Sequence, residues 1–490
     1  MRSAQITMTD RPLQTQKRLF GNTALLSLAE GVSQLVNFAF VVSLARVFGR
    51  EVVGVYAFSM AVGAFLSILI SSGTLTLVLR KISREPDRTA ETTGALLGFQ
   101  ICLALVLVLV AHVAARLLNA SPLMVWGVTL IVGHQMLIQI TQLFVVGFMA
   151  REEMLPVALL PLVRRVTMLL LAGLAMICGG RAEFTLLAMP VAALLTLIMA
   201  GVHAARRFGS PRLRLEPAEV ASYLAEARPF FFVVVLSTLY SRLGIVYLTV
   251  LGGQVEAGLF ASAERLVVAA GIVQAMFAAA LFPVVSRLWE TDRERFAELT
   301  QRAGRLVMFL ALPVATLLTL FARDIVGIFY GEAFSDATGI LAAVAWVLVV
   351  RGIGQLLSTT AQAADQQSVL VTSRALGLIA LTLASLALIP RFGGMGLVVA
   401  MLASEILAAM LSMVALQRAR VPVIGFGSVL RVVPACVLAA GLAYLVSDLA
   451  LWLRVFVVAG GGAAALWICG AIRGNDLAYL RAIVESRKAE

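Results

Sequence analysis

The chain has 490 residues, of which 61% are hydrophobic and only 13% are charged, and its mean hydropathy is +0.96. A soluble chain carries about 25% charged residues because its surface faces water, so this composition excludes a soluble globular protein. The net charge of +12 does not indicate a nucleic-acid partner. The basic residues lie in short loops at the ends of apolar runs, where anionic lipid and insertion topology account for them.

Apolar runs long enough to cross a bilayer follow one another along the whole chain. Short turns rich in glycine, proline and charged residues separate them. We therefore predict an all-α integral membrane protein with about fourteen transmembrane helices. The predicted spans are 20–46, 52–79, 94–118, 122–149, 156–179, 183–206, 228–252, 255–287, 304–329, 337–364, 369–390, 393–417, 428–449 and 451–472.

The basic residues predict the orientation of these spans. If the N-terminus is cytoplasmic, most of the lysines and arginines lie at cytoplasmic ends and loops. Such a bias predicts that both termini are cytoplasmic, which requires an even number of spans. The external side then holds only Arg46, Arg50, Arg116, Arg181, Arg323, Arg391 and Arg454.

Two connections in different halves of the chain share a pattern. Residues 253–261 repeat the glycines, the apolar-aromatic pair and the alanine of residues 49–57 at an offset of 204. After the following span, Glu-Thr-Asp-Arg at 290–293 repeats Glu-Pro-Asp-Arg at 85–88 at an offset of 205. The pattern predicts two copies of a six-helix unit with the same orientation in the membrane. Parallel repeats of this type are a transporter architecture, with the substrate path between the halves.

The first two spans contain several short motifs, and residues Gly258–Leu266 of the eighth span resemble part of them. The first set is Gly21-Asn22-Thr23-Ala24, Asn37-Phe38, Leu44–Gly49, Gly54-Val55-Tyr56, Ser72-Gly73 and Leu79-Arg80-Lys81. In these motifs the chain resembles the polysaccharide-biosynthesis membrane proteins. These are the oligosaccharide flippases of the multidrug/oligosaccharidyl-lipid/polysaccharide exporter superfamily. The resemblance extends over nearly the whole chain in length, span count and repeat placement.

The resemblance implies two six-helix lobes around a central cavity that opens alternately to each side, with two extra C-terminal helices outside the lobes. The expected parts are an N-terminal lobe at 1–206, a cytoplasmic linker at 207–227, a C-terminal lobe at 228–417, and the extra helices and cytoplasmic tail at 418–490. The implied cargo is an anionic oligosaccharide on a polyprenyl diphosphate. The expected location is the bacterial cytoplasmic (inner) membrane. Membrane lipids are expected partners, and other polysaccharide-assembly proteins are potential ones.

Charged residues within the spans point to a similar function by a separate route. Each arginine near the centre of a membrane helix costs roughly 2.5–3.5 kcal/mol on insertion scales, so several together need a reason. They must face a wet cavity, pair with acids or extend to an interface. No lysine lies within a span, and an excess of arginine suits an anionic cargo because the guanidinium binds two phosphate oxygens. The six arginines are Arg164, Arg165, Arg242, Arg265, Arg351 and Arg374.

Of these, Arg242 and Arg351 lie deepest and are expected to line the cavity, with a buried ion pair as the alternative. Arg265 either lines the path or meets a charge on another helix. Arg374 lies near the cytoplasmic end of its span, so extension to the interface competes with cargo binding there. One of Arg164 and Arg165 extends to the interface and the other reaches the inner mouth of the cavity; we take Arg165 as the substrate-binding residue.

Two further residues complete the expected site. Glu30 in the first span is the candidate for ion coupling, with a salt bridge to a cavity arginine as the alternative. His134 lies mid-span beside Gln135, Gln139 and Gln142. This polar stripe either hydrogen-bonds sugar hydroxyls or holds helices together by packing.

Three functions are compared on these grounds. The first is a flippase that carries a lipid-linked oligosaccharide to the external leaflet without chemical change. The second is a cation antiporter of the multidrug-extrusion type, which would need a cavity led by carboxylates. The third, a membrane glycosyltransferase or glycan polymerase, needs a carboxylate or metal site on a sizeable loop, and the external loops are short. We therefore expect no enzyme activity, catalytic residue, metal or cofactor.

Overall fold

The computed structural model describes residues 10–71, 74–211 and 217–422 and scattered residues between 434 and 464. Across these ranges the chain is helical and no strand occurs, which confirms the predicted all-α class. The predicted spans 428–449 and 451–472 fall where only scattered residues are described. The helices are α1 (Asp10–Ser71), α2 (Thr74–Arg84), α3 (Thr89–Leu117), α4 (Pro122–Ala150), α5 (Met154–Ile177), α6 (Ala182–Phe208), α7 (Pro217–Ala270), α8 (Ile272–Thr291), α9 (Arg293–Leu320), α10 (Ala322–Tyr330), α11 (Ala337–Ala363) and α12 (Gln367–Arg418).

In the described part of the chain, nine helices are long and apolar enough to cross a membrane, so the protein is a multi-pass membrane protein. Three of them contain a break at a glycine with a positive φ, namely Gly49 at 78°, Gly253 at 90° and Gly393 at 53°. A positive φ is costly for residues with a side chain, so glycine fits these turns. The breaks divide α1, α7 and α12 into two segments each, which yields twelve segments that follow the first twelve predicted spans in order.

The ninth span differs from the prediction. The alternating acids and bases over 288–303 predict either a helix on the lipid headgroups or a solvated linker, followed by a span at 304–329, whereas α9 begins at Arg293 and ends at Leu320. The early start has a local cause, because the Asp292 carboxylate accepts a hydrogen bond of 3.0 Å from the Arg295 backbone N–H and caps the helix. The residues after Phe321 form the separate short helix α10.

The described chain divides into two compact units. Unit 1 contains the residues up to Phe48 and Val55–Thr238, and unit 2 contains Gly49–Gly54 and the residues from Leu239 onwards. The break in α1 therefore belongs to unit 2, although the helical segments on both sides of it belong to unit 1. The expected lobe and linker boundaries remain predictions, and residues 217–227 of the expected linker form the beginning of α7.

Within unit 2, the turn 49–54 meets its repeat-related turn in α7. A Cβ atom added to Gly54 would overlap the carbonyl oxygen of Gln254, and one added to Gly258 would overlap the carbonyl oxygen of Arg50. Arg50 and Gly54 correspond to Gln254 and Gly258 at the sequence offset of 204. The contact is therefore reciprocal between the two copies, as expected for a duplicated unit. Only residues without a side chain allow the two backbones to approach this closely.

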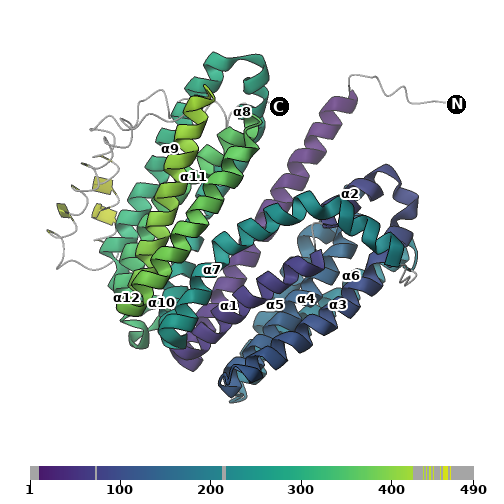
Figure 1. Ribbon diagram of the computed structural model, residues 1–490, viewed down its shortest axis with the longest axis horizontal. Helices are drawn as coiled ribbons and strands as arrows, with labels where there is room; N and C mark the ends of the chain where they lie inside the picture. The colour runs from purple at the N-terminus through teal and green to yellow at the C-terminus, as the bar shows by residue number, and fades with distance from the viewer. Residues whose placement is uncertain are drawn as a thin grey trace. The chain divides into compact units, whose positions relative to one another are not determined.

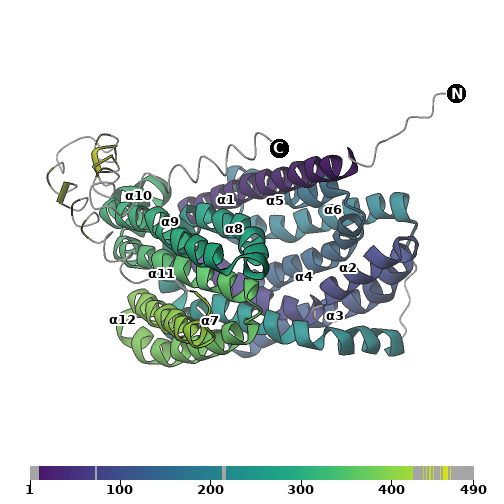
Figure 2. The same cartoon turned by 90° about the horizontal axis from the view of Figure 1, so that it is seen from above.

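One helix lies at the centre of each unit. In unit 1, α4 packs against α2, α3, α5 and α6, and its residues Val132, Met136 and Leu143 are fully buried. In unit 2, α11 packs against α8, α9 and α12 and buries Leu341 and Val344. Figures 1 and 2 show each group of helices side by side. These central helices carry polar side chains as well, which form the candidate site.

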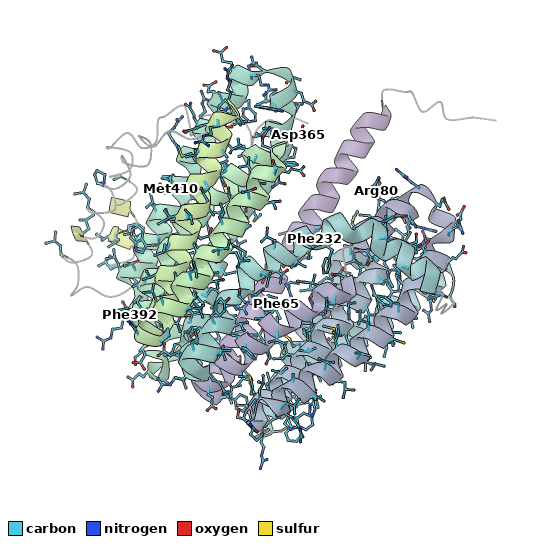
Figure 3. The ribbon with its side chains drawn as sticks, viewed as in Figure 1. Phe65, Arg80, Phe232, Asp365, Phe392 and Met410 are labelled. Atoms are coloured by element: carbon cyan, nitrogen blue, oxygen red, sulfur yellow. The ribbon has the colours of Figure 1, made fainter. Side chains whose placement is uncertain are left out.

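Large apolar side chains are exposed along the helices, as a lipid-facing surface requires. Phe232, Phe392 and Met410 are 68%, 61% and 55% exposed. Figure 3 shows them projecting from helices, whereas the exposed charged residue Asp365 stands at the turn between α11 and α12. An apolar exterior on this scale is stable in hydrocarbon and not in water.

Candidate polar clusters within the membrane helices

Unit 1 contains a polar cluster built around two adjacent arginines, which we call the unit 1 cluster. It consists of Glu30, Gln34, His134, Arg164 and Arg165. The Nη1 and Nη2 atoms of Arg165 donate to the Glu30 Oε1 atom at 3.3 and 3.4 Å. Gln34, one turn along α1, donates its amide N–H to the same oxygen at 2.6 Å. Glu30 therefore forms a salt bridge to an arginine, and its expected role in ion coupling stays a prediction.

His134 anchors the second arginine of the unit 1 cluster. Its ring is 2% exposed, and its Nδ1 atom lies 2.8 Å from the Met189 carbonyl oxygen. A carbonyl oxygen only accepts, so Nδ1 carries a proton. A guanidinium only donates, so Nε2, which faces Arg164, carries none and the ring is neutral. The Nη1 atom of Arg164 lies 3.4 Å from that Nε2 and donates to it. The contact links α4 and α5 and gives Arg164 a hydrogen-bond partner without a negative charge.

Unit 2 contains a second cluster, the unit 2 cluster, in which two arginines meet two acids. It consists of Tyr240, Glu264, Arg351, Arg374 and Glu405. Arg351 donates from Nε to Glu405 at 3.0 Å, and its Nη1 lies 3.9 Å from Glu264. Arg374 lies 3.6 Å from the other oxygen of Glu405, whose side chain is only 5% exposed. The buried ion pair weighed for Arg351 is thus present, and the two acids balance the two arginines.

Tyr240 and Ser404 brace this second cluster. The guanidinium carbon of Arg374 lies 4.7 Å from the centre of the Tyr240 ring, a cation–π distance. Ser404 Oγ lies 2.7 Å from the Gly377 carbonyl oxygen and 3.2 Å from the Tyr240 hydroxyl. Ser404 donates to the Gly377 carbonyl oxygen, and its oxygen lies within hydrogen-bond distance of the Tyr240 hydroxyl. This chain of contacts holds Arg374 within unit 2, and its predicted extension to the interface stays a prediction.

The two remaining predicted arginines belong to neither cluster. Arg242 is exposed and Arg265 is partly buried, and neither pairs with an acid within 4.0 Å among the described residues. Both lie in unit 2. The cargo-binding role predicted for them is not decided by these contacts and stays a prediction.

The two clusters stand partly on corresponding helices of the repeat. The unit 1 cluster uses the first segment of α1 together with α4 and α5. The unit 2 cluster uses α11 and both segments of α7 and of α12, because Glu264 and Glu405 lie after the breaks at Gly253 and Gly393. In the order of spans, both clusters use the first, fourth and fifth helices of their copy, and the unit 2 cluster also uses the second and the sixth. The two clusters therefore share three helix positions of the repeat, while both acids of the unit 2 cluster come from helices that the unit 1 cluster does not use.

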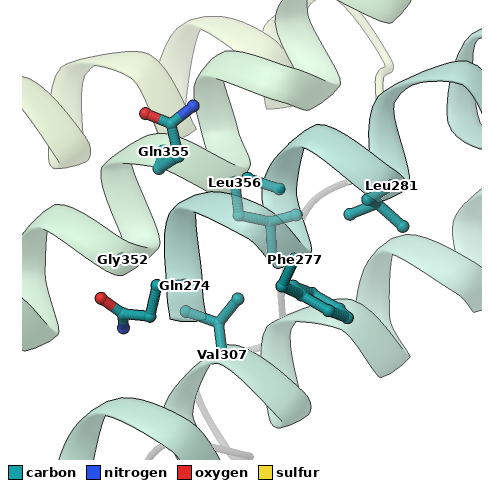
Figure 4. A pocket seen from close by; sticks show the side chains of 8 residues that line it. Gln274, Phe277, Leu281, Val307, Gly352, Gln355 and Leu356 are labelled. Carbon is teal, nitrogen blue, oxygen red and sulfur yellow. The ribbon is translucent and has the colours of Figure 1, made fainter. Parts of the chain in front are cut away.

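Unit 2 also contains a small pocket between α8, α9 and α11, which Figure 4 shows from close by. Its lining is apolar apart from Gln274 and Gln355. The Gln274 amide nitrogen is buried without a hydrogen-bond partner among the described residues. A Cβ atom on Gly352 would lie 2.6 Å from that nitrogen, so the glycine makes room for the amide.

Sequence reasoning did not include some residues of these clusters in the site. Arg164, Glu264, Glu405 and Tyr240 were outside the expected set. The two acids carried a signal, because a carboxylate within a span needs a partner of opposite charge. The partners could not be identified, because the sequence does not state which helices are neighbours. In the described ranges, no three His, Cys, Asp or Glu side chains gather so that they could hold a metal ion.

The family model of polysaccharide biosynthesis proteins matches residues 19–289, which is more than half of the chain. The chain belongs to the polysaccharide biosynthesis protein family. None of the curated proteins matches the sequence of this family member.

Solved structures of other transporters share the fold. The lipid II flippase MurJ in an inward closed conformation is 14% identical, with a TM-score of 0.76, and the match covers 93% of this chain and 99% of that one. An inward-facing multidrug resistance MATE family transporter of the MOP superfamily is 16% identical, with a TM-score of 0.65. The match covers 79% of this chain and 94% of that one. A MOP superfamily transporter from Pyrococcus furiosus with a binding pocket of reverse polarity is 15% identical, with a TM-score of 0.56. The match covers 81% of this chain and 94% of that one. At these identities the likeness establishes the fold.

Proposed function

We propose that this protein is a flippase that moves an oligosaccharide linked to a polyprenyl diphosphate across the bacterial cytoplasmic membrane by alternating access. Membership of the polysaccharide biosynthesis protein family supports this proposal, and so does the fold shared with the lipid II flippase MurJ. In the proposed arrangement two six-helix lobes surround a central cavity and both termini are cytoplasmic. The sugar and diphosphate pass through the cavity while the lipid tail stays in the bilayer.

The observation that carries the proposal is the excess of arginine within the membrane helices. The unit 1 cluster sets two guanidiniums against one carboxylate, and Arg242 and Arg265 have no acid within ion-pair distance in the described part of unit 2. Each unpaired guanidinium in hydrocarbon costs several kcal/mol, roughly 2.5–3.5 on insertion scales. A diphosphate cargo offsets this cost because its charge is opposite and its oxygens accept the N–H groups in pairs.

The test is reconstitution. Purified protein in liposomes should move a fluorescent polyprenyl-diphosphate oligosaccharide between leaflets, measured by quenching with a reagent that does not cross the bilayer. Replacement of Arg242 or Arg265 with Ala should slow this movement while the protein remains in the membrane. The exposed Arg181 at the turn before α6 provides the matched control, because Arg181→Ala removes the same charge outside the clusters. Wild-type liposomes that move no more cargo than empty ones would defeat the proposal.

The competing function is a cation antiporter of the multidrug-extrusion type, and the shared fold of the MATE family transporter is the observation in its favour. The two functions differ in the charge that the site must hold. Cells that lack the protein should lose exported glycan and keep their normal accumulation of cationic dyes. The opposite result, with normal glycan and raised dye accumulation, would assign the protein to drug export.

A further inference from the structure

The place where the cargo's phosphate is held follows from the charges of the two clusters, given the proposed function. We propose that Arg164 and Arg165 of unit 1 bind the diphosphate group, and that His134 is the positioning residue that holds the Arg164 guanidinium. Glu30 holds Arg165 in the same way. The site thus consists of two neighbouring guanidiniums on α5, supported from α4 and α1.

Of the two clusters, the charge balance favours the unit 1 cluster. In the unit 2 cluster, Glu264 and Glu405 lie within 4.0 Å of the two arginines, so the charges cancel. In the unit 1 cluster, Glu30 pairs with Arg165, and Arg164 has the neutral His134 as its partner. The unit 1 cluster therefore carries one net positive charge, which an anion neutralises. In surroundings of low dielectric constant, this uncompensated charge attracts an anion much more strongly than it would in water.

The count of hydrogen-bond donors points the same way. A guanidinium has five N–H donors. Arg164 uses one of them on His134, and Arg165 uses two on a single oxygen of Glu30. No other hydrogen bond of these two guanidiniums occurs within the described residues. The remaining donors are enough to hold two phosphate groups in paired contacts.

His134 suits the positioning role because it is fixed and uncharged. The Met189 carbonyl holds the ring through Nδ1, and the ring is almost fully buried. It therefore orients Arg164 without cancelling the charge of the guanidinium, in contrast to Glu405 beside Arg351. The depth of the site also fits a lipid-linked cargo. Arg165 lies eleven residues after the start of α5, which is roughly 16 Å at 1.5 Å per residue, about half of a hydrocarbon core of roughly 30 Å.

The experiment measures binding of a polyprenyl diphosphate to the purified full chain in phosphatidylcholine nanodiscs. Arg164→Gln and Arg165→Gln should each weaken binding roughly ten- to a hundred-fold, which is the loss of charged hydrogen bonds. Arg181→Gln is the control and should bind as the wild type does. Arg164→Lys keeps the charge and loses the fork, so it should bind more weakly than wild type and more tightly than Arg164→Gln.

The role of His134 is tested by two amides of different reach. A glutamine places its oxygen near the position of Nε2 and can still accept from Arg164, whereas an asparagine places its amide near Nδ1 and cannot. His134→Gln should therefore keep binding within about three-fold of wild type, and His134→Asn should lose roughly ten-fold. Equal losses in both variants, with both still folded by size-exclusion chromatography, would reduce His134 to a packing role and overturn this part of the inference.

Two further results would overturn the site itself. One is unchanged binding in both glutamine variants of the arginines. The other is complete competition by phosphatidylglycerol added to the nanodiscs, which would assign the arginines to ordinary lipid headgroups. If wild-type protein transports cargo while these variants bind it normally, the site is wrong and the flippase function stands. If the variants lose binding and wild-type liposomes show no transport, the site stands and the flippase function is wrong.

Discussion

The reciprocal glycine contact of unit 2 provides the sharpest test of the fold. Gly54→Ala and Gly258→Ala each place a methyl group on a backbone carbonyl oxygen of the opposite segment. Overpacking a tight site costs about 1–3 kcal/mol. The upper part of this range is expected here because a backbone carbonyl cannot swing aside as a flexible side chain can. Both variants should therefore unfold at a clearly lower temperature than the wild type.

The matched controls are glycines at which an added Cβ atom would have no close neighbour. An added Cβ on Gly133 of α4 or Gly173 of α5 would have no atom within 4 Å. Alanine is better than glycine inside a helix by roughly 0.5–1 kcal/mol, so Gly133→Ala and Gly173→Ala should leave stability equal or slightly raised. The opposite signs separate close backbone approach from a general effect of alanine.

The assay is thermal unfolding of detergent-solubilised protein, followed by the loss of monodisperse material on size-exclusion chromatography. The double variant adds a second measure. Once the segments around Gly54 have moved apart, the methyl group at Gly258 meets less resistance, so the two losses should sum to more than the loss of the double variant. If Gly54→Ala and Gly258→Ala are as stable as Gly133→Ala, the backbones do not touch and the reasoning fails.

Three further substitutions in unit 2 have expected outcomes in the same assay. Glu256→Ala removes the carboxylate that accepts from the Gly394 backbone N–H at 2.8 Å, and the loss of this cap should cost about 1–2 kcal/mol, with Glu256→Gln retaining part of it. Gly352→Ala crowds the Gln274 amide and should cost about 1–3 kcal/mol. Gln274→Ala in the same chain should restore only part of this loss, because the added Cβ would also lie 2.9 Å from Val307 Cγ1. Glu405→Ala leaves Arg351 and Arg374 without their shared acid and should cost roughly 3 kcal/mol. This value is at the lower end of the cost of breaking a buried ion pair, because both arginine side chains are about a third exposed. A loss for Glu405→Ala no larger than that for the Arg181→Ala control would refute the last estimate.

Much of the fold could be predicted because the membrane restricts the choices. Length and apolarity were sufficient to place the first twelve spans in order, and the turns at Gly49, Gly253 and Gly393 coincide with three predicted boundaries. The ninth span was misplaced for a specific reason. Alternating acids and bases over 288–303 are typical of a surface helix, and the ion pairs that they form in the first turns of α9 allow the same residues to begin a membrane helix instead.

Less of the candidate site could be predicted, because charge pairing depends on which helices are neighbours. The sequence identified the six arginines and Glu30 within the spans and the alternative roles for them. It could not show that Glu405 on α12 would meet Arg351 on α11, or that His134 on α4 would meet Arg164 on α5. These contacts decide which guanidinium remains short of negative charge, and this is the quantity that a cargo site depends on.

The turn 49–54 has a consequence for how the protein is made. It is synthesised early, between two stretches of unit 1, yet it belongs to unit 2. A fragment that starts at α7 would therefore lack one side of the glycine contact, whatever the integrity of its own helices. Halves of this protein expressed from separate genes should therefore fold only when both are present. In the natural chain, residues 49–54 of unit 2 are already synthesised and waiting when the rest of that unit leaves the ribosome.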